Sequence, residues 1–142
     1  MRINEVIHNK GSSVITARAD QDVRHLVDLL AEHRIGAVVI TDDGDTVTGI
    51  VGERDVVQGL RRFGPDLLDR PISDVMDSDV HTCGMDDELA AVATDMTRFR
   101  ARHLPVMVDG HLAAIVSIGD IVKSRIDQLQ TEQEHLVKYL HG

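Results

Sequence analysis

The sequence predicts a mixed α/β (α+β) protein made of two β-α-β-β-α repeats, packed as a pseudo-two-fold pair, with an extended C-terminal helix. Two observations carry this prediction. Residues 14–60 and 80–126 repeat one another at an offset of 66, which becomes 65 after a one-residue gap. Within each copy the hydrophobic pattern changes between strand and helix periods in the same order. Two such copies favour one compact pair with any ligand at the seam between them.

The elements follow the same order in both copies. An acidic segment after the first strand suits the start of a helix, and an apolar stripe with helical spacing follows it. Asp-Gly turns between the next two strands predict a β-hairpin. A second helix is expected to start at Asp55 in one copy and at Asp120 in the other. The expected strands are residues 14–16, 37–40 and 47–51, then 80–82, 103–107 and 112–117.

Other segments join or extend the two copies. Residues 61–71 contain one Gly and two Pro and read as a linker. The helix from Asp120 continues to Gly142, and its apolar residues follow steps of four and three. Such a stripe either docks on a second copy of the chain or packs on its own domain. We expect repeat 1 with the start of the linker in residues 1–66, repeat 2 in 67–128 and a C-terminal helical extension in 129–142.

The composition argues against several classes of function. The 142-residue chain carries a net charge of −9 and has two Phe, one Tyr and no Trp, so we expect no nucleic-acid partner. The N-terminus lacks the apolar core of a signal peptide, and the longest apolar run is too short for a bilayer. We therefore expect a cytoplasmic protein without a membrane contact. Cys83 is expected to be a small buried residue, and the His spacings predict no metal site.

The candidate chemistry lies where a strand runs into the second helix of each copy. Residues 49–55 and 114–120 each place a small residue at the strand end and an Asp three positions later. A helix N-terminus can hold a phosphate, and a carboxylate there can accept two hydrogen bonds from the vicinal hydroxyls of a ribose. The alternative is that Asp55 and Asp120 are only helix caps.

With these strings present twice, the chain resembles the cystathionine-β-synthase (CBS) domain pair, also called a Bateman module. The resemblance rests on residues 49–55, 115–120 and 102–106, the last reading Arg-His-Leu-Pro-Val. It covers the whole chain except about the last dozen residues. More narrowly, the chain is similar to small bacterial proteins that consist of one CBS pair. The resemblance implies adenine nucleotides in clefts between the repeats, and two pairs that commonly assemble as a flat disc.

The resemblance also implies two clefts, each with an Asp from one repeat and a wall from the other. In the first cleft Asp120 would bind ribose, Ser117 and the backbone of Gly119 would bind phosphate, and Ile115 would lie against the base. The wall opposite would consist of Val14, Ile15, Ile35, Gly36 and Ala37. In the second cleft Asp55 would bind ribose and Ile50 would lie against the base. The wall opposite would consist of Val80, His81, Ala101, Arg102 and His103.

The second cleft departs from the family pattern. Gly52 stands where the family usually has Ser or Thr, which removes a phosphate-binding hydroxyl. Positive charge from Arg54, Arg102 and His103 could compensate, because a charge-assisted contact is about twice as strong as a neutral one. Alternatively, Arg102 and His103 bind no ligand and lie at a strand edge exposed to solvent.

Three functions from different classes stay open at this stage. The first is a regulatory module for energy or redox sensing, which binds AMP (alternatively ATP, NADH or S-adenosylmethionine), assembles as a homodimer and signals to an unknown protein. The second is an enzyme, which is poorly supported because no nucleophile–base pair or metal cluster stands out. The third is a structural dimerisation module without ligand. Ser117 together with Asp120 favours the first, with no catalytic cofactor.

Overall fold

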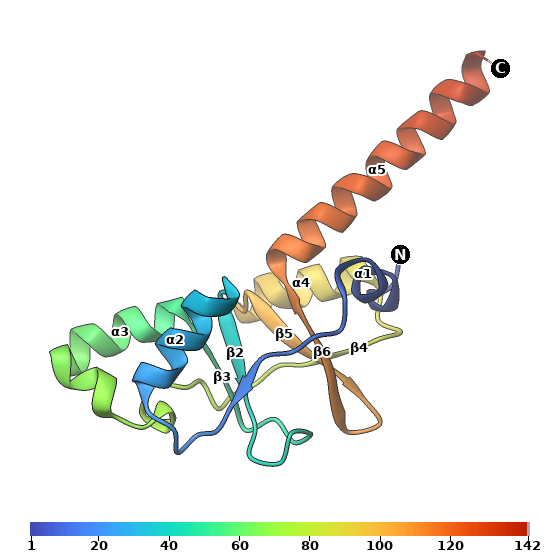
Figure 1. Ribbon diagram of the computed structural model, residues 1–142. Helices are drawn as coiled ribbons and strands as arrows, with labels where there is room; N and C mark the ends of the chain where they lie inside the picture. Colours follow the sequence, from blue (N-terminus) through green and yellow to red (C-terminus); the bar gives the residue numbers. More distant parts are fainter. Residues whose placement is uncertain (142) are drawn as a thin grey trace.

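The computed structural model describes residues 1–141 and contains two three-stranded sheets, each with helices packed beside it (Figure 1). In both sheets the first strand pairs parallel to the central strand and the third pairs antiparallel to it. The expected mixed α/β fold with two β-α-β-β-α repeats is therefore confirmed. The strands are β1 (Thr16–Ala17), β2 (Ala37–Ile40), β3 (Gly49–Gly52), β4 (Cys83–Gly84), β5 (His103–Val108) and β6 (His111–Ser117).

The helices repeat with the same offset as the sequence. Arg34 and Arg100 end equivalent helices in the left-handed conformation, with φ of 53° and 54°. Thr41 and Ser124 are the buried polar side chains, and the rest of the core is apolar. The helices are α1 (Ile3–Lys10), α2 (Val23–His33), α3 (Glu53–Phe63), α4 (Leu89–Phe99) and α5 (Ile118–His141), with short 3-10 helices at Gly64–Asp69 and Ile72–Asp74.

Several element boundaries differ from the expected ones, among them the start of β3, which lies at Gly49 rather than at residue 47. The first strand of each repeat starts later, at Thr16 and at Cys83, because only these residues reach the register of the central strand. Asp55 and Asp120 are the third residues of their helices rather than the first. The expected linker is ordered, since α3 continues to Phe63 and a 3-10 helix follows with its Leu67 side chain fully buried.

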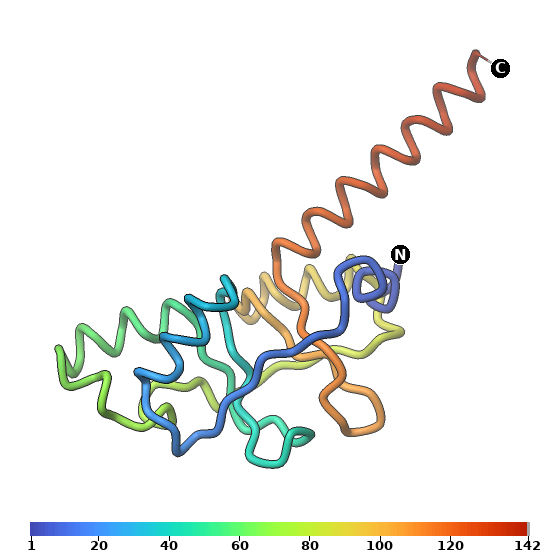
Figure 2. The backbone as a smooth tube through the Cα atoms, viewed as in Figure 1, coloured from blue at the N-terminus to red at the C-terminus, as the bar shows by residue number. Residues whose placement is uncertain are grey.

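The leading helical segment of each repeat packs on the other repeat. Ile3, Val6 and Ile7 of α1 belong to the core formed by the second sheet with α4 and α5. Ile72 lies in the core of the first sheet instead. Figure 2 shows the dark blue N-terminal segment beside the second repeat, from which the chain crosses to the first. Each core therefore contains residues from both sides of the expected boundary between residues 66 and 67.

The distal part of α5 leaves the body of the molecule (Figure 1). Ile121 and Ser124 are the buried residues of this helix. Beyond them, Ile126, Leu129, Leu136 and Leu140 are between 47% and 69% exposed. No helix within residues 1–141 is both long enough and apolar enough to cross a membrane.

Candidate functional site

A pocket of about 290 Å³ lies at the seam between the repeats, where α3 begins. The first repeat supplies the end of β3 and the first turn of α3, and the second repeat supplies the segment that enters β5. A volume of this size is at the lower end of small-molecule sites. The lining residues are Gly36, Ala37, Ile50, Gly52, Glu53, Arg54, Asp55, Gln58, Asp77, Arg100, Ala101, Arg102 and His103.

Asp55 holds the start of α3 and faces this pocket. Its Oδ2 accepts a hydrogen bond from the N–H of Gly52 at 2.8 Å. Burial raises the pKa of the Asp55 carboxyl and Asp77 adds to the rise, while the Gly52 N–H and Arg54 oppose it. The helix-cap alternative is therefore partly right, because the carboxylate does cap α3, but one cap contact leaves it acceptor capacity toward the pocket.

Gly52 faces a close backbone neighbour, which explains why a side chain there is difficult. A Cβ at this position would lie 3.0 Å from the carbonyl oxygen of Gly36. That same oxygen accepts the N–H of Glu53 at 3.1 Å, so it cannot move freely away. A serine at this position would need the start of β2 to shift. The pocket is lined instead by several cations.

Those cations come from both repeats. Arg54 lies on α3, while Arg100 and Arg102 lie in the short segment between α4 and β5. Their charge balances the acids Glu53, Asp55 and Asp77 on the same walls. The pocket thus combines guanidinium groups that suit a phosphate with a carboxylate that suits a diol.

His103 is the first residue of β5, and its ring lies where it would meet a Cβ added at Gly36, at 3.3 Å. Burial lowers the pKa of His103, and Lys10 and Arg102 lower it further, against the opposing effects of Asp120 and Glu53. The ring is therefore neutral near neutral pH. An anion placed in the pocket would favour its protonated form.

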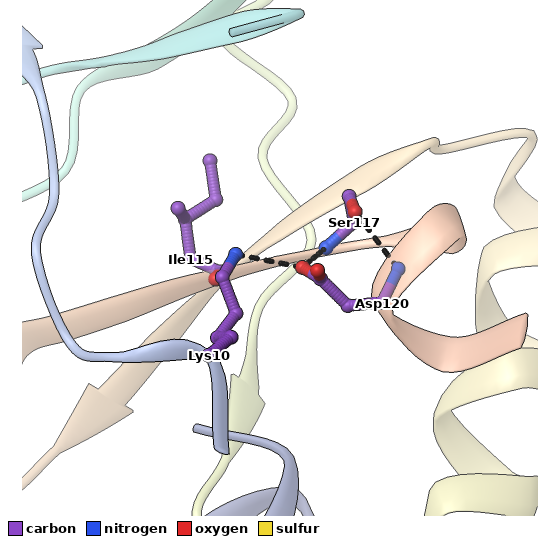
Figure 3. Close-up of polar contacts among 4 residues, drawn as sticks. All are labelled: Lys10, Ile115, Ser117 and Asp120. Carbon is purple, nitrogen blue, oxygen red and sulfur yellow. Dashed lines mark hydrogen bonds and ion pairs between the residues drawn. The ribbon is translucent and has the colours of Figure 1, made fainter. Parts of the chain in front are cut away.

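The equivalent position in the second repeat is arranged differently. Asp120 Oδ2 accepts the N–H of Ser117 at 2.9 Å, and Ser117 Oγ accepts the N–H of Asp120 at 3.1 Å, which forms a reciprocal cap. Lys10 lies across this cap, with its Nζ 2.6 Å from Asp120 Oδ2 (Figure 3). Burial would raise the pKa of Asp120, but the hydrogen bonds from Lys10 and Ser117 prevail and lower it.

The structure brings together most of the residues expected in the second cleft. Val80 and His81 do not line the pocket, and the His81 ring is stacked on Phe99 at a centroid distance of 3.7 Å. The residues from the expected set that do line it are Ile50, Gly52, Arg54, Asp55, Ala101, Arg102 and His103.

The residues expected in the first cleft divide between two places. Gly36 and Ala37 line the Asp55 pocket, because the start of β2 lies beside the start of α3. Val14 packs against the core of the second repeat, whereas Ile15 and Ile35 pack against that of the first. Ser117 bonds Asp120 directly, and Lys10 links the carbonyl of Ile115 to the same carboxylate. Gly119 lies exposed beside Ser117.

Five polar residues of these sites were not assigned from the sequence, namely Lys10, Glu53, Gln58, Asp77 and Arg100. Lys10 precedes the repeated unit, so no spacing relates it to Asp120. Asp77 lies outside the matching copies 14–60 and 80–126, and its backbone bridges to Ile50. Arg100 had a detectable signal, since its repeat equivalent Arg34 stands at the same helix end.

The remaining candidate chemistry is limited. Cys83 is free and buried, and burial raises the pKa of its thiol to about 12, which makes it a poor nucleophile. Among residues 1–141, no three His, Cys, Asp or Glu side chains are grouped so that they could hold a metal ion.

Comparison with known proteins decides the family. The profile of the CBS domain matches residues 6–62 and 72–127, which together make up most of the sequence. The chain belongs to the CBS domain family. Its two matched segments are the two repeats of the structure, so the expected CBS pair is confirmed.

Similar CBS proteins come from bacteria and from plants. A CBS-domain containing protein from Agrobacterium tumefaciens has a crystal structure with a TM-score of 0.85 and 36% identity, covering 88% of this chain and 99% of that one. A mitochondrial CBS domain-containing protein of Arabidopsis thaliana, CBSX3, is 27% identical over 99% of this chain and 72% of its own length.

A third comparison is with the CBS domain pair of protein MJ0100, whose structure is a complex with 5′-methylthioadenosine and S-adenosyl-L-methionine. It has a TM-score of 0.80 at 21% identity and covers 90% of this chain and 98% of that one. This likeness extends the agreement in fold to a distant CBS pair.

Proposed function

We propose that this CBS pair binds an adenine nucleotide, AMP in the first place, and regulates a partner protein by changing shape. The observation that carries the proposal is the pocket between the repeats, which Asp55 and arginines of both repeats line together. A ligand that contacts both walls would bias how the repeats sit against one another, which is what a regulatory module requires.

The ligand's parts match the chemistry of the pocket. Asp55 accepts hydrogen bonds from the ribose hydroxyls, and the apolar side chain of Ile50 lies against the base. The phosphate takes the cationic side that Arg54, Arg100 and Arg102 provide. These cations favour AMP, ATP or NADH over the positively charged S-adenosylmethionine, although the MJ0100 pair carries such adenosyl ligands. ATP and NADH are the longer ligands that this basic pocket would also take.

We propose the Asp55 pocket as the first to be occupied. Gly52 removes a hydroxyl there, but the pocket is open, whereas Asp120 is already paired with Lys10. The Asp120 cleft then accepts AMP once that pair opens. We further propose a non-catalytic role in the cytoplasm, with a structural module that binds no ligand as the alternative.

Thermal unfolding with added AMP, ATP, NADH or S-adenosylmethionine tests this proposal. A ligand that binds only the folded chain raises the unfolding midpoint, by about 5 °C or more at a hundred-fold excess over its Kd. We expect the largest rise with a phosphorylated ligand. If none of the four raises the midpoint, the structural alternative replaces the proposed one.

We also propose that the chain forms a homodimer. The apolar side chains at Ile126, Leu129, Leu136 and Leu140 follow steps of three or four residues, with Gln133 in the polar slot. They are exposed on a helix that stands away from the body of the molecule. A second copy presents the same stripe, and a two-fold contact covers both at once.

The lowered pKa of His103 predicts a loss of stability in mild acid. Below the ordinary value of 6.5 the unfolded chain binds a proton that the folded chain does not, so the ligand-free protein becomes less stable as pH falls through 6.5. Phosphate bound near the ring reverses this preference, so that the His103 ring takes up the proton when the ligand binds. AMP should therefore raise the unfolding midpoint more at about pH 5.5 than at about pH 7.5.

His103→Gln provides the comparison. AMP itself titrates near pH 6, and this effect acts equally on both proteins, so their difference isolates the His103 ring. The variant should lose the extra stabilisation by AMP at low pH. Equal pH profiles for the two proteins would contradict a phosphate beside His103.

A further inference from the structure

Lys10 lies against the residues expected to form the Asp120 cleft. Its ammonium nitrogen lies 2.6 Å from Asp120 Oδ2 and 3.0 Å from the carbonyl oxygen of Ile115 (Figure 3). These are the groups that, under the proposed function, would meet the ribose and the base of a nucleotide. The cation therefore lies where the ribose and the base would lie, and a nucleotide that uses Asp120 Oδ2 and the Ile115 carbonyl must displace Lys10.

The ion pair between Lys10 and Asp120 can open at a low cost in free energy. The side chains of Lys10 and Asp120 are 30% and 22% exposed, so water screens their attraction. Lysine also carries its charge on a flexible four-carbon stem. The backbone at Lys10 is held nonetheless, because Ile3, Val6 and Ile7 anchor α1 in the core of the second repeat. After release the ammonium stays within reach of the cleft.

A phosphate donor lies next to the same carboxylate. Ser117 Oγ accepts the N–H of Asp120, so its own hydrogen is free to donate. Because Asp120 contacts both Ser117 and Lys10, a phosphate seated at Ser117 lies within a side-chain movement of the released ammonium. Lysine is a common partner for phosphate in proteins.

We propose that Lys10 selects the ligand of the Asp120 cleft by charge: it pairs with Asp120 when the cleft is empty and transfers to the ligand's phosphate when the ribose takes its place. This inference rests on the proposed nucleotide-binding function. A phosphorylated nucleotide breaks the Lys10–Asp120 ion pair but offers its phosphate to Lys10 as a new partner. Uncharged adenosine breaks the pair without replacing it, and the sulfonium of S-adenosylmethionine is repelled.

Calorimetry with AMP and adenosine separates these effects, in an Asp55→Asn background that weakens the other pocket. With Lys10 present, AMP should bind at least about tenfold more tightly than adenosine. In Lys10→Met this ratio should fall by about tenfold, while adenosine itself binds more tightly because no ion pair has to open. Lys10→Arg should keep the preference for AMP.

Lys123→Met is the matched control, since it removes the same charge from an exposed site near Asp120 on α5. It should leave the ratio unchanged. If Lys10→Met left the ratio of AMP to adenosine affinity unchanged, or bound adenosine more weakly, the proposed transfer of Lys10 from Asp120 to the phosphate would be wrong. Nucleotide binding itself would still stand. If neither AMP nor adenosine binds the wild-type chain, the proposed nucleotide-binding function is wrong, and the proposed transfer of Lys10 is wrong with it.

Discussion

Replacing Asp55 with alanine should weaken AMP binding at the open pocket by about ten- to a hundred-fold, or about 1.5–3 kcal/mol. The carboxylate is the group in this pocket best suited to accept both ribose hydroxyls, and it is half-buried between the two repeats. Titration calorimetry measures the change directly. A folded variant that binds AMP as tightly as the wild type would rule out Asp55 as the ribose partner.

Asp22→Ala is the matched control for this prediction. Asp55 also caps α3 through the N–H of Gly52, so its loss costs about 1 kcal/mol of stability apart from any ligand. Asp22 also makes a single contact at a helix start, from the N-cap position of α2, where it accepts the N–H of His25 at 2.9 Å, and it does not line the pocket. Both variants should lose similar stability, but only Asp55→Ala should lose affinity.

Truncation after Ser124 should weaken the proposed homodimer by about a hundred-fold or more, because it removes four exposed apolar side chains that a second copy would bury. The repeat core should remain folded, since the buried residues of α5, Ile121 and Ser124, are retained. Sedimentation velocity on both proteins measures the change in association, and circular dichroism checks the fold. A full-length chain that is monomeric at tens of micromolar would exclude the dimer.

A pair of single substitutions locates the interface more finely. Leu136 lies on the stripe, and Val137 is the next residue, about 100° around the helix. Both side chains are about half exposed, at 59% and 48%, so the two changes are closely matched. Leu136→Gln should weaken the dimer, and Val137→Gln should affect it much less. Equal effects would place the interface elsewhere on α5.

The repeat made most of the fold predictable. Asp55 and Asp120 were expected at equivalent strand-to-helix junctions because strand and helix periods are written in neighbouring residues. Both junctions are as expected, apart from a shift of two residues in the helix starts. The same local pattern singled out Gly52, although the carbonyl of Gly36 that crowds it only became visible in the structure.

The division of residues between the two clefts was less predictable. Gly36 and Ala37 were expected opposite Asp120, but they line the pocket of Asp55. Which side of the seam a strand end reaches depends on how the two sheets are turned toward one another. Hydrophobic periodicity assigns a residue to a face of its own element, and it contains no information about that angle.

The sequence by itself determined the two-fold repeated unit, the order of its strands and helices and the Asp at each helix start, since all of these depend on contacts between near neighbours. Tertiary structure alone decided that Ile3 and Ile72 complete the core of the opposite repeat. It also placed Lys10 on Asp120, a contact between residues 110 positions apart. The physical reason is the same in both cases: apolar burial brings distant segments together, and a charge carried on such a segment meets partners that no sequence spacing records.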